Sequence, residues 1–202
     1  MHIRSVGTAA LLIECAADEV EAWRAELWRR RAAGELAAAE IVPGARTVLL
    51  DGLPAPDAAA DLIAACDPPP PAETASGDIV EIPTVYDGPD LATVAALWSV
   101  PIPTVIDRLT STEFRVAFCG FAPGFGYLTG LPPELAVPRL ATPRTSVPAG
   151  SVGLAGPYAG IYPTSSPGGW QLVGRTEVTL FDVDRDPPAL LAPGTTVRLV
   201  RA

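Results

Sequence analysis

The sequence GFAPGFGYLTGLPPELAVPRLATPRTSVPAGSVG, residues 120–153, is crowded with glycine and proline. Glycine permits backbone conformations that a Cβ forbids, while proline fixes φ and removes a hydrogen-bond donor. A long segment of this composition can be rigid without being helix or strand. We therefore interpret residues 120–153 as a shaped surface held by the elements on either side of it.

Strand-like runs flank this segment. Residues 113–120, EFRVAFCG, alternate apolar and polar side chains, which is the two-residue period of a half-buried strand. Three later runs are also strand-like: WQLVG at 170–174, EVTLFDV at 177–183 and TTVRLVR at 195–201. Short strands between Gly/Pro turns are typical of a β-barrel or sandwich. Only two helices are predicted in this part, after Pro89 and across residues 103–111.

The N-terminal third has a different pattern. Two short strands precede a helix that ends near Gly34, and two further strands precede a short helix that stops at a run of four prolines. The order β-β-α-β-β-α predicts a small two-layer α/β domain at residues 1–67. We expect a proline-rich linker at 68–77 and a barrel domain at 78–202, which together make an α+β chain.

Composition excludes several classes of function. The net charge of −9 over 202 residues leaves no basic surface for nucleic acid, so we expect no such partner. The apolar run near the N-terminus is too short to span a bilayer, and we expect neither a membrane segment nor a signal peptide. Three widely spaced cysteines favour buried thiols in a reducing cytoplasm.

Two residue types are almost missing. The chain has no lysine, and its only histidine is His2. These counts exclude a P-loop lysine, a Schiff base and a histidine-containing catalytic triad, and they predict no metal site in this chain. Any proton transfer must therefore use carboxylates, tyrosine or a partner chain, and no catalytic residue is assigned.

Five blocks in order carry a resemblance to a known family: EIPTVYDGPDL (81–91), GFAPGFGYLTGLP (120–132), PRLATPRTSVPAGSVGLAG (138–156), IYPTSSPGGWQLVGRT (161–176) and LLAPGTTVRL (190–199). Together they resemble the family of 5-oxoprolinase B subunits, also called the KipI or allophanate hydrolase subunit 1 family. The resemblance implies a small N-terminal α/β domain followed by a cyclophilin-like β-barrel.

The resemblance also implies an activity and partners. The family works with a C subunit, which is similar to allophanate hydrolase subunit 2, and with an A subunit. The complex opens 5-oxo-L-proline to L-glutamate with ATP, so this chain is expected to be one part of an ATP-dependent hydrolase and to be inactive alone. The resemblance leaves open which of the subunits binds the ATP.

Three arginines are candidates for binding an anionic substrate. Arg139 and Arg144 each follow a proline, and Arg175 lies in VGRT, residues 173–176. Guanidinium forks match carboxylate and phosphate groups with paired hydrogen bonds. An equally weighted alternative is that these arginines tie loops to backbone carbonyls or to the many acidic residues.

Aromatic side chains near the turns offer apolar walls and hydroxyls. We expect Phe125 in the barrel core and Tyr162 and Trp170 at an interface or pocket. The complete candidate substrate or partner surface is Phe121, Pro123, Tyr127, Arg139, Arg144, Tyr162, Trp170 and Arg175. The run GFGYLTG does not predict a nucleotide loop, because its glycine spacing is wrong and no helix follows it.

One position departs from the family pattern. Where that pattern places a histidine, this sequence has Leu109. Two other functions therefore stay open beside 5-oxoproline hydrolysis. The chain could be a KipI-like regulatory inhibitor of a sensor histidine kinase, or a urea- or allophanate-type carboxyl-transfer module.

Overall fold

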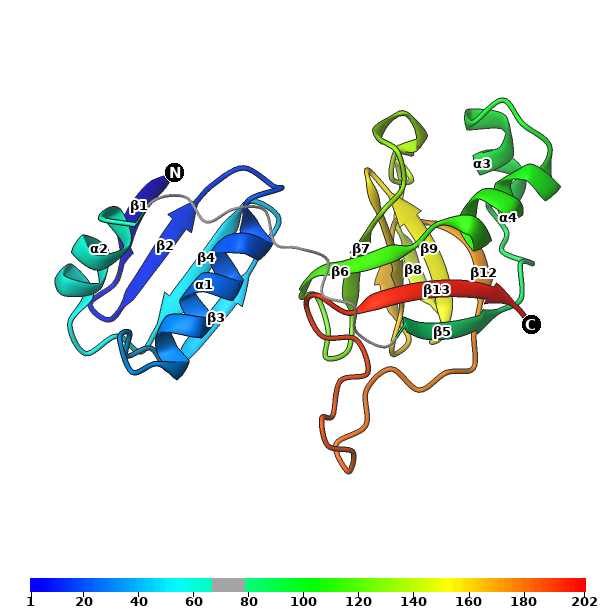
Figure 1. Cartoon of the computed structure of the whole chain (residues 1–202). Helices are drawn as coiled ribbons and strands as arrows, with labels where there is room; N and C mark the ends of the chain where they lie inside the picture. Colours follow the sequence, from blue (N-terminus) through cyan, green and yellow to red (C-terminus); the bar gives the residue numbers. More distant parts are fainter. Residues whose placement is uncertain (67–78) are drawn as a thin grey trace. The chain divides into compact units, whose positions relative to one another are not determined.

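The computed structural model describes residues 1–66 and 79–202, and these form two compact units (Figure 1). The linker predicted at residues 68–77 lies outside the described residues. Within the two described ranges, each helix is too short or too polar to cross a membrane.

The first unit is a four-stranded antiparallel sheet covered by two helices. Its elements follow the predicted order: β1 (His2–Val6), β2 (Ala10–Glu14), α1 (Val20–Ala32), β3 (Glu40–Pro43), β4 (Thr47–Asp51) and α2 (Pro56–Ala64). The strands are ordered β1-β2-β4-β3, with α1 against β3 and β4 and α2 against β1 and β2. The core takes side chains from both layers: Leu11, Ile13, Trp23, Leu27, Val48, Leu50 and Ile63.

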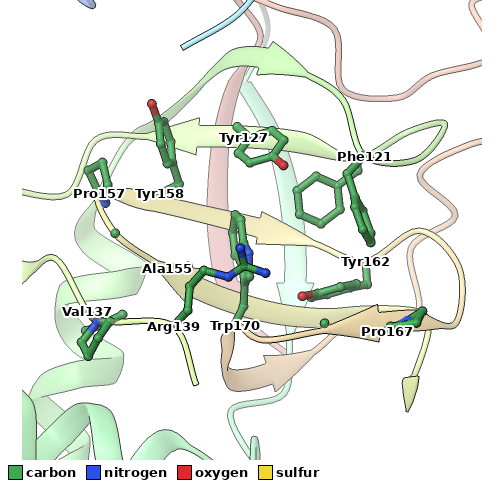
Figure 2. Close-up of a pocket in the computed structure, with 14 residues that line it drawn as sticks. Phe121, Tyr127, Val137, Arg139, Ala155, Pro157, Tyr158, Tyr162, Pro167 and Trp170 are labelled. Carbon is green, nitrogen blue, oxygen red and sulfur yellow. The ribbon is translucent and has the colours of Figure 1, made fainter. Parts of the chain in front are cut away.

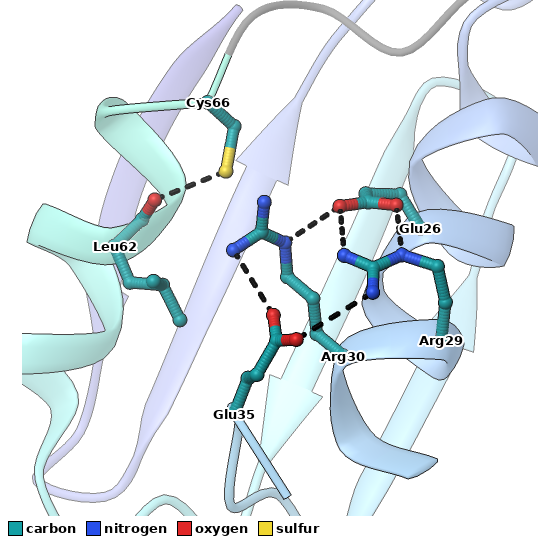
Figure 3. Close-up of polar contacts among 6 residues, drawn as sticks. All are labelled: Glu26, Arg29, Arg30, Glu35, Leu62 and Cys66. Carbon is teal, nitrogen blue, oxygen red and sulfur yellow. Dashed lines mark hydrogen bonds and ion pairs between the residues drawn. The ribbon is translucent and has the colours of Figure 1, made fainter. Parts of the chain in front are cut away.

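An ion-pair network stabilises the C-terminal half of α1 (Figure 3). Glu26 accepts hydrogen bonds from the Nε atoms of Arg29 and Arg30, at 2.8 and 2.7 Å. The hydrogen bond from Arg29 is the main reason that the pKa of Glu26 falls to about 2, so this carboxylate is ionised at neutral pH. Glu35 lies 3.6 Å from each of the two arginines and extends the network.

All three cysteines are free thiols. Cys15 is buried, and the Cys66 thiol donates to the carbonyl oxygen of Leu62 at 3.0 Å (Figure 3). The Cys119 thiol donates to the carbonyl oxygen of Leu191 at 3.3 Å. Burial raises the pKa of Cys15 and of Cys119, so both thiols stay protonated near neutral pH.

The second unit is a seven-stranded sheet that curls into a nearly closed barrel (Figure 1). In spatial order its strands are β12 (Gln171–Arg175), β9 (Ser151–Ala155), β10 (Tyr158–Ile161), β7 (Gly126–Thr129), β6 (Phe114–Cys119), β13 (Thr196–Arg201) and β5 (Ile79–Thr84). Only β13 and β5 are parallel; the other neighbours are antiparallel. The α+β class and the barrel-like sheet predicted from the sequence are confirmed.

The two edges of this sheet meet beyond β5. Val85 and Arg175 exchange both backbone hydrogen bonds, with N···O distances of 2.8 and 2.9 Å. An antiparallel bridge of this kind satisfies groups that an open edge would leave unpaired. The last residue of β12 therefore completes the barrel.

Smaller elements surround the barrel. They are the helices α3 (Leu91–Leu97) and α4 (Ile102–Ser111), the 3₁₀ turn η1 (Pro133–Leu135) and a two-stranded ribbon of β8 (Arg144–Val147) with β11 (Ser166–Gly168). Leu109 on α4 is fully buried in the core that α4 shares with the barrel. The apolar residue at this position thus has a packing role.

The prediction of a strand at residues 177–183 is wrong. The structure has a loop there, and only Phe181 forms an isolated bridge, to Ala189. The guanidinium group of Arg185 donates to the carbonyl oxygens of Thr179, Leu180 and Pro188, at 2.9 to 3.2 Å. These bonds fold the segment back on itself, which alternating hydrophobicity does not reveal.

We expect Gly174→Ala to strain the closure of the barrel. A Cβ at Gly174 would lie 2.5 Å from the carbonyl oxygen of Val85, a separation that real Cβ atoms essentially never show. Forcing β12 away from Val85 should lower the free energy of unfolding by about 1 to 3 kcal/mol. Urea denaturation measures this loss.

Gly169→Ala is the matched control, because its new Cβ would meet Pro143 at an ordinary 3.6 Å. Equal losses of stability in the two variants would contradict the role of Gly174 in closing the barrel.

Candidate functional site

A cavity of about 510 Å³ opens on the barrel unit (Figure 2). The loop before β7, the loop before β8 and the ends of β9, β10 and β11 contribute its walls. Its lining consists of Phe121, Phe125, Tyr127, Val137, Pro138, Arg139, Ala155, Gly156, Pro157, Tyr158, Tyr162, Pro167, Gly168 and Trp170. Most of these residues belong to the glycine- and proline-rich segment or follow it closely.

Aromatic rings form the floor of the cavity. Phe125 and Trp170 meet edge to face, with ring centroids 5.4 Å apart and an interplanar angle of 90°. Tyr162 packs against Phe125 in the same manner, at 5.4 Å and 80°. All three rings are at most 7% exposed. Edge-to-face pairs are favoured by the charge distribution of the rings, so these contacts stabilise the floor.

Glycines make this arrangement possible. A Cβ at Gly160 would lie 2.9 Å from ring atoms of both Phe125 and Trp170. A Cβ at Gly168 would collide with the Tyr162 hydroxyl. The two glycines therefore leave the space that the aromatic rings occupy.

Arg139 supplies the only positive charge among the lining residues. Its side chain is exposed, and Figure 2 shows it extending from the loop toward the aromatic rings. In the described part of the chain it makes no hydrogen bond or ion pair with another residue, and no carboxylate lines the cavity. An anion that enters the cavity would thus meet a guanidinium group that has not been neutralised.

Tyrosine hydroxyls are the other polar groups of the cavity. Burial raises the pKa of Tyr162, although a hydrogen bond from the Trp170 backbone and the charge of Arg139 oppose that rise. Burial also raises the pKa of Tyr158. Both hydroxyls are therefore protonated at neutral pH, where they can donate hydrogen bonds but cannot act as strong bases.

The structure brings together five of the eight predicted surface residues. The five that line the cavity are Phe121, Tyr127, Arg139, Tyr162 and Trp170. Pro123 is exposed in the same loop as Phe121 but outside the lining. Arg144 and Arg175 lie outside it as well, because each is held by a carboxylate.

Arg144 is part of a partly buried ion pair next to Trp170 of the cavity floor. Its Nη2 lies 2.7 Å from Oδ1 of Asp90, and its Nη1 donates to the carbonyl oxygen of Trp170 at 3.3 Å. The other oxygen of Asp90 accepts the backbone N–H of Leu172 at 2.6 Å. Asp90 is only 7% exposed, so this ion pair fixes the backbone at Trp170 and at the start of β12.

Arg175 has an exposed partner instead. Its Nε donates to Oδ2 of Asp87 at 3.0 Å, and about half of each side chain is accessible to solvent. The pair connects β12 to the turn after β5, near the closure of the barrel.

Sequence reasoning missed several lining residues. Phe125 is buried, as predicted for a core residue, and its ring also faces the cavity. Tyr158 and the three prolines Pro138, Pro157 and Pro167 had no assignment. The one local signal for Tyr158 was its place directly after the turn residues Gly156 and Pro157.

Metal binding has no structural support in the part of the chain described. No cluster of three or more His, Cys, Asp or Glu side chains with the spacing of a metal site occurs in residues 1–66 and 79–202.

We expect Arg144→Ala to destabilise the protein by about 2 to 3 kcal/mol, because it leaves the buried carboxylate of Asp90 without its charged partner. Arg175→Ala removes an exposed pair and should cost about 1 kcal/mol or less. Urea denaturation of both variants provides the comparison. A loss for Arg144→Ala no larger than that for Arg175→Ala would contradict the supporting role of the Arg144–Asp90 pair.

Comparison with known proteins gives a consistent result. The model of the family described as "Carboxyltransferase domain, subdomain C and D" matches residues 1–191. The chain is 49% identical over 124 residues to the 5-oxoprolinase B subunit of Escherichia coli O157:H7, which is 60% of this chain and 57% of that protein. It is also 49% identical over 126 residues to the 5-oxoprolinase B subunit of Bacillus subtilis (strain 168), which is 61% of this chain and 52% of that one. The matched region thus spans little more than half the length of these curated relatives.

A solved structure supports the fold. The crystal structure of the protein TTHA0988 superposes with a TM-score of 0.80 and 31% identity, and the match covers 100% of this chain but 41% of that one. The longer protein therefore contains a large part that has no counterpart here.

Proposed function

We propose that this chain, which belongs to the family of carboxyltransferase domains, subdomains C and D, is the B subunit of a heteromeric 5-oxoprolinase. The complex opens the lactam ring of 5-oxo-L-proline by adding water across the amide C–N bond, which yields L-glutamate. ATP hydrolysis supplies the free energy. The observation that carries the proposal is the 49% identity to the B subunits of two different bacteria.

The barrel cavity would form the part of the substrate site that this chain contributes. The substrate is a small ring that carries a carboxylate, and the cavity combines apolar ring walls with one unpaired guanidinium group at Arg139. A bidentate hydrogen bond from Arg139 would hold the carboxylate. The protonated hydroxyl of Tyr162, which points toward Arg139 in Figure 2, is a donor suited to the lactam oxygen.

Catalysis requires further chains. The cavity lining holds no carboxylate and no histidine, and its tyrosines are poor bases, so the group that activates water must come from elsewhere. We assign this role to a C subunit similar to allophanate hydrolase subunit 2, and an A subunit would complete the enzyme. The extra part of TTHA0988, of which the match covers only 41%, supports a second polypeptide region beside this fold.

ATP is bound by the complex in this account. The run GFGYLTG contains β7 of the barrel and opens no helix, so it lacks the helix N-terminus that a phosphate loop uses. The three free thiols favour a reducing compartment, and we place the complex in the cytoplasm.

Arg139→Ala tests the proposal in a complex reconstituted with candidate A and C subunits. Loss of the charge-assisted hydrogen bonds should lower kcat/KM for 5-oxo-L-proline by about ten- to a hundredfold. The assay is ATP hydrolysis that depends on 5-oxo-L-proline, together with glutamate release. Arg139→Lys should recover part of the loss, because it retains the charge without the fork.

Arg198→Ala is the matched control, since Arg198 is a half-exposed arginine on β13 outside the cavity lining. The chain alone should show no turnover. Full activity of the Arg139→Ala complex, or robust turnover by the isolated chain, would contradict the shared-site proposal.

Carboxyl transfer is the second candidate function, and the description of the matching family favours it. A complex of this kind would require a biotin-bearing partner and would accept urea or a related amide. Turnover of urea without turnover of 5-oxo-L-proline in the reconstituted complex would support this candidate against the first.

A further inference from the structure

Phe121 has an unusual backbone conformation. Its φ is +68°, in the region that side chains with a Cβ rarely adopt. The N–H of Ala122 donates to the carbonyl oxygen of Gly120 at 2.8 Å, so the three residues form a γ-turn with Phe121 at its centre. A γ-turn with positive φ is rare and strained, and strain of this kind concentrates at ligand contacts.

The surrounding loop holds Phe121 in this conformation. The Phe125 N–H donates to the carbonyl oxygen of Ala122 at 3.0 Å, and the Gly120 N–H donates to that of Phe125 at 3.2 Å. Gly124 follows with φ +83°, and a Cβ there would lie 2.7 Å from the Cβ of Phe181. The loop is thus fixed on both sides of the strained residue.

The result of the strain is an exposed ring at the rim of the cavity (Figure 2). Phe121 is 60% exposed, whereas Phe125 and Tyr162 below it are 1% exposed. Its ring meets those two rings edge to face, at 5.3 and 6.1 Å. The Phe121 ring therefore packs against the aromatic floor and still leaves more than half of its surface accessible to a ligand.

We propose that Phe121 is a specificity-determining residue: its ring packs against the flat lactam ring of the substrate while Arg139 holds the carboxylate. This inference rests on the proposed function of the cavity. The flat amide of a lactam offers a face for contact with an aromatic ring, and a ligand in this place would cover apolar surface that is now exposed. The strained turn therefore positions the ring in advance of binding.

Two substitutions separate the ring from the strain. Phe121→Ala removes the ring and keeps a Cβ at positive φ, whereas Phe121→Gly removes both. We expect each to raise KM for 5-oxo-L-proline about tenfold in the reconstituted complex with kcat changed less than about threefold. The thermal midpoint of Phe121→Gly should lie about 2 to 4 °C above that of Phe121→Ala, because glycine relieves the strain. Equal losses of binding in two variants that differ in stability cannot be explained by misfolding.

Phe121→Tyr should keep the wild-type KM, because it retains the ring. Trp28→Ala is the control for loss of an exposed aromatic ring, since Trp28 is 44% exposed on α1 of the first unit. An unchanged KM in both Phe121→Ala and Phe121→Gly, with wild-type turnover intact, would overturn the inference. A wild-type complex that never turns over 5-oxo-L-proline would instead overturn the proposed function, and this inference with it.

Discussion

The cavity depends on the absence of a side chain at Gly160. The rings of Phe125 and Trp170 pack across this position, where any Cβ would lie 2.9 Å from both. A Cβ at Gly168 would likewise collide with the hydroxyl of Tyr162. Aromatic rings can thus lie against the backbone of the sheet, and the space above them remains open as a cavity instead of filling with smaller side chains.

The two proline-preceded arginines differ in role because of what lies within reach of each. Asp90 engages Arg144, which ties the ribbon of β8 and β11 to the segment that carries Trp170. Arg139 has no such partner among the described residues and faces the cavity. Arg144 therefore stabilises the cavity floor, whereas Arg139, five positions earlier in the same proline-rich segment, leaves its charge available to a ligand.

Much of the architecture could be predicted from local patterns. The ββαββα order, the helix at α4 and the strands β6, β12 and β13 follow from periodicity and from Gly/Pro punctuation. The strand predicted at 177–183 failed because Arg185 binds the backbone carbonyls of that segment. The roles of Arg139 and Arg144 could not be separated from the sequence, since Asp90 lies 54 residues from Arg144 along the chain. The γ-turn at Phe121 likewise depends on tertiary contacts of Gly124 that no local pattern indicates.

The most direct test of the substrate site is a crystal structure of the complex with 5-oxo-L-proline bound. We expect ligand density in the barrel cavity, with the carboxylate within hydrogen-bond distance of the Arg139 guanidinium group and the lactam ring against Phe121. Density for the ligand at another site, with this cavity unoccupied and Arg139 unengaged, would contradict it.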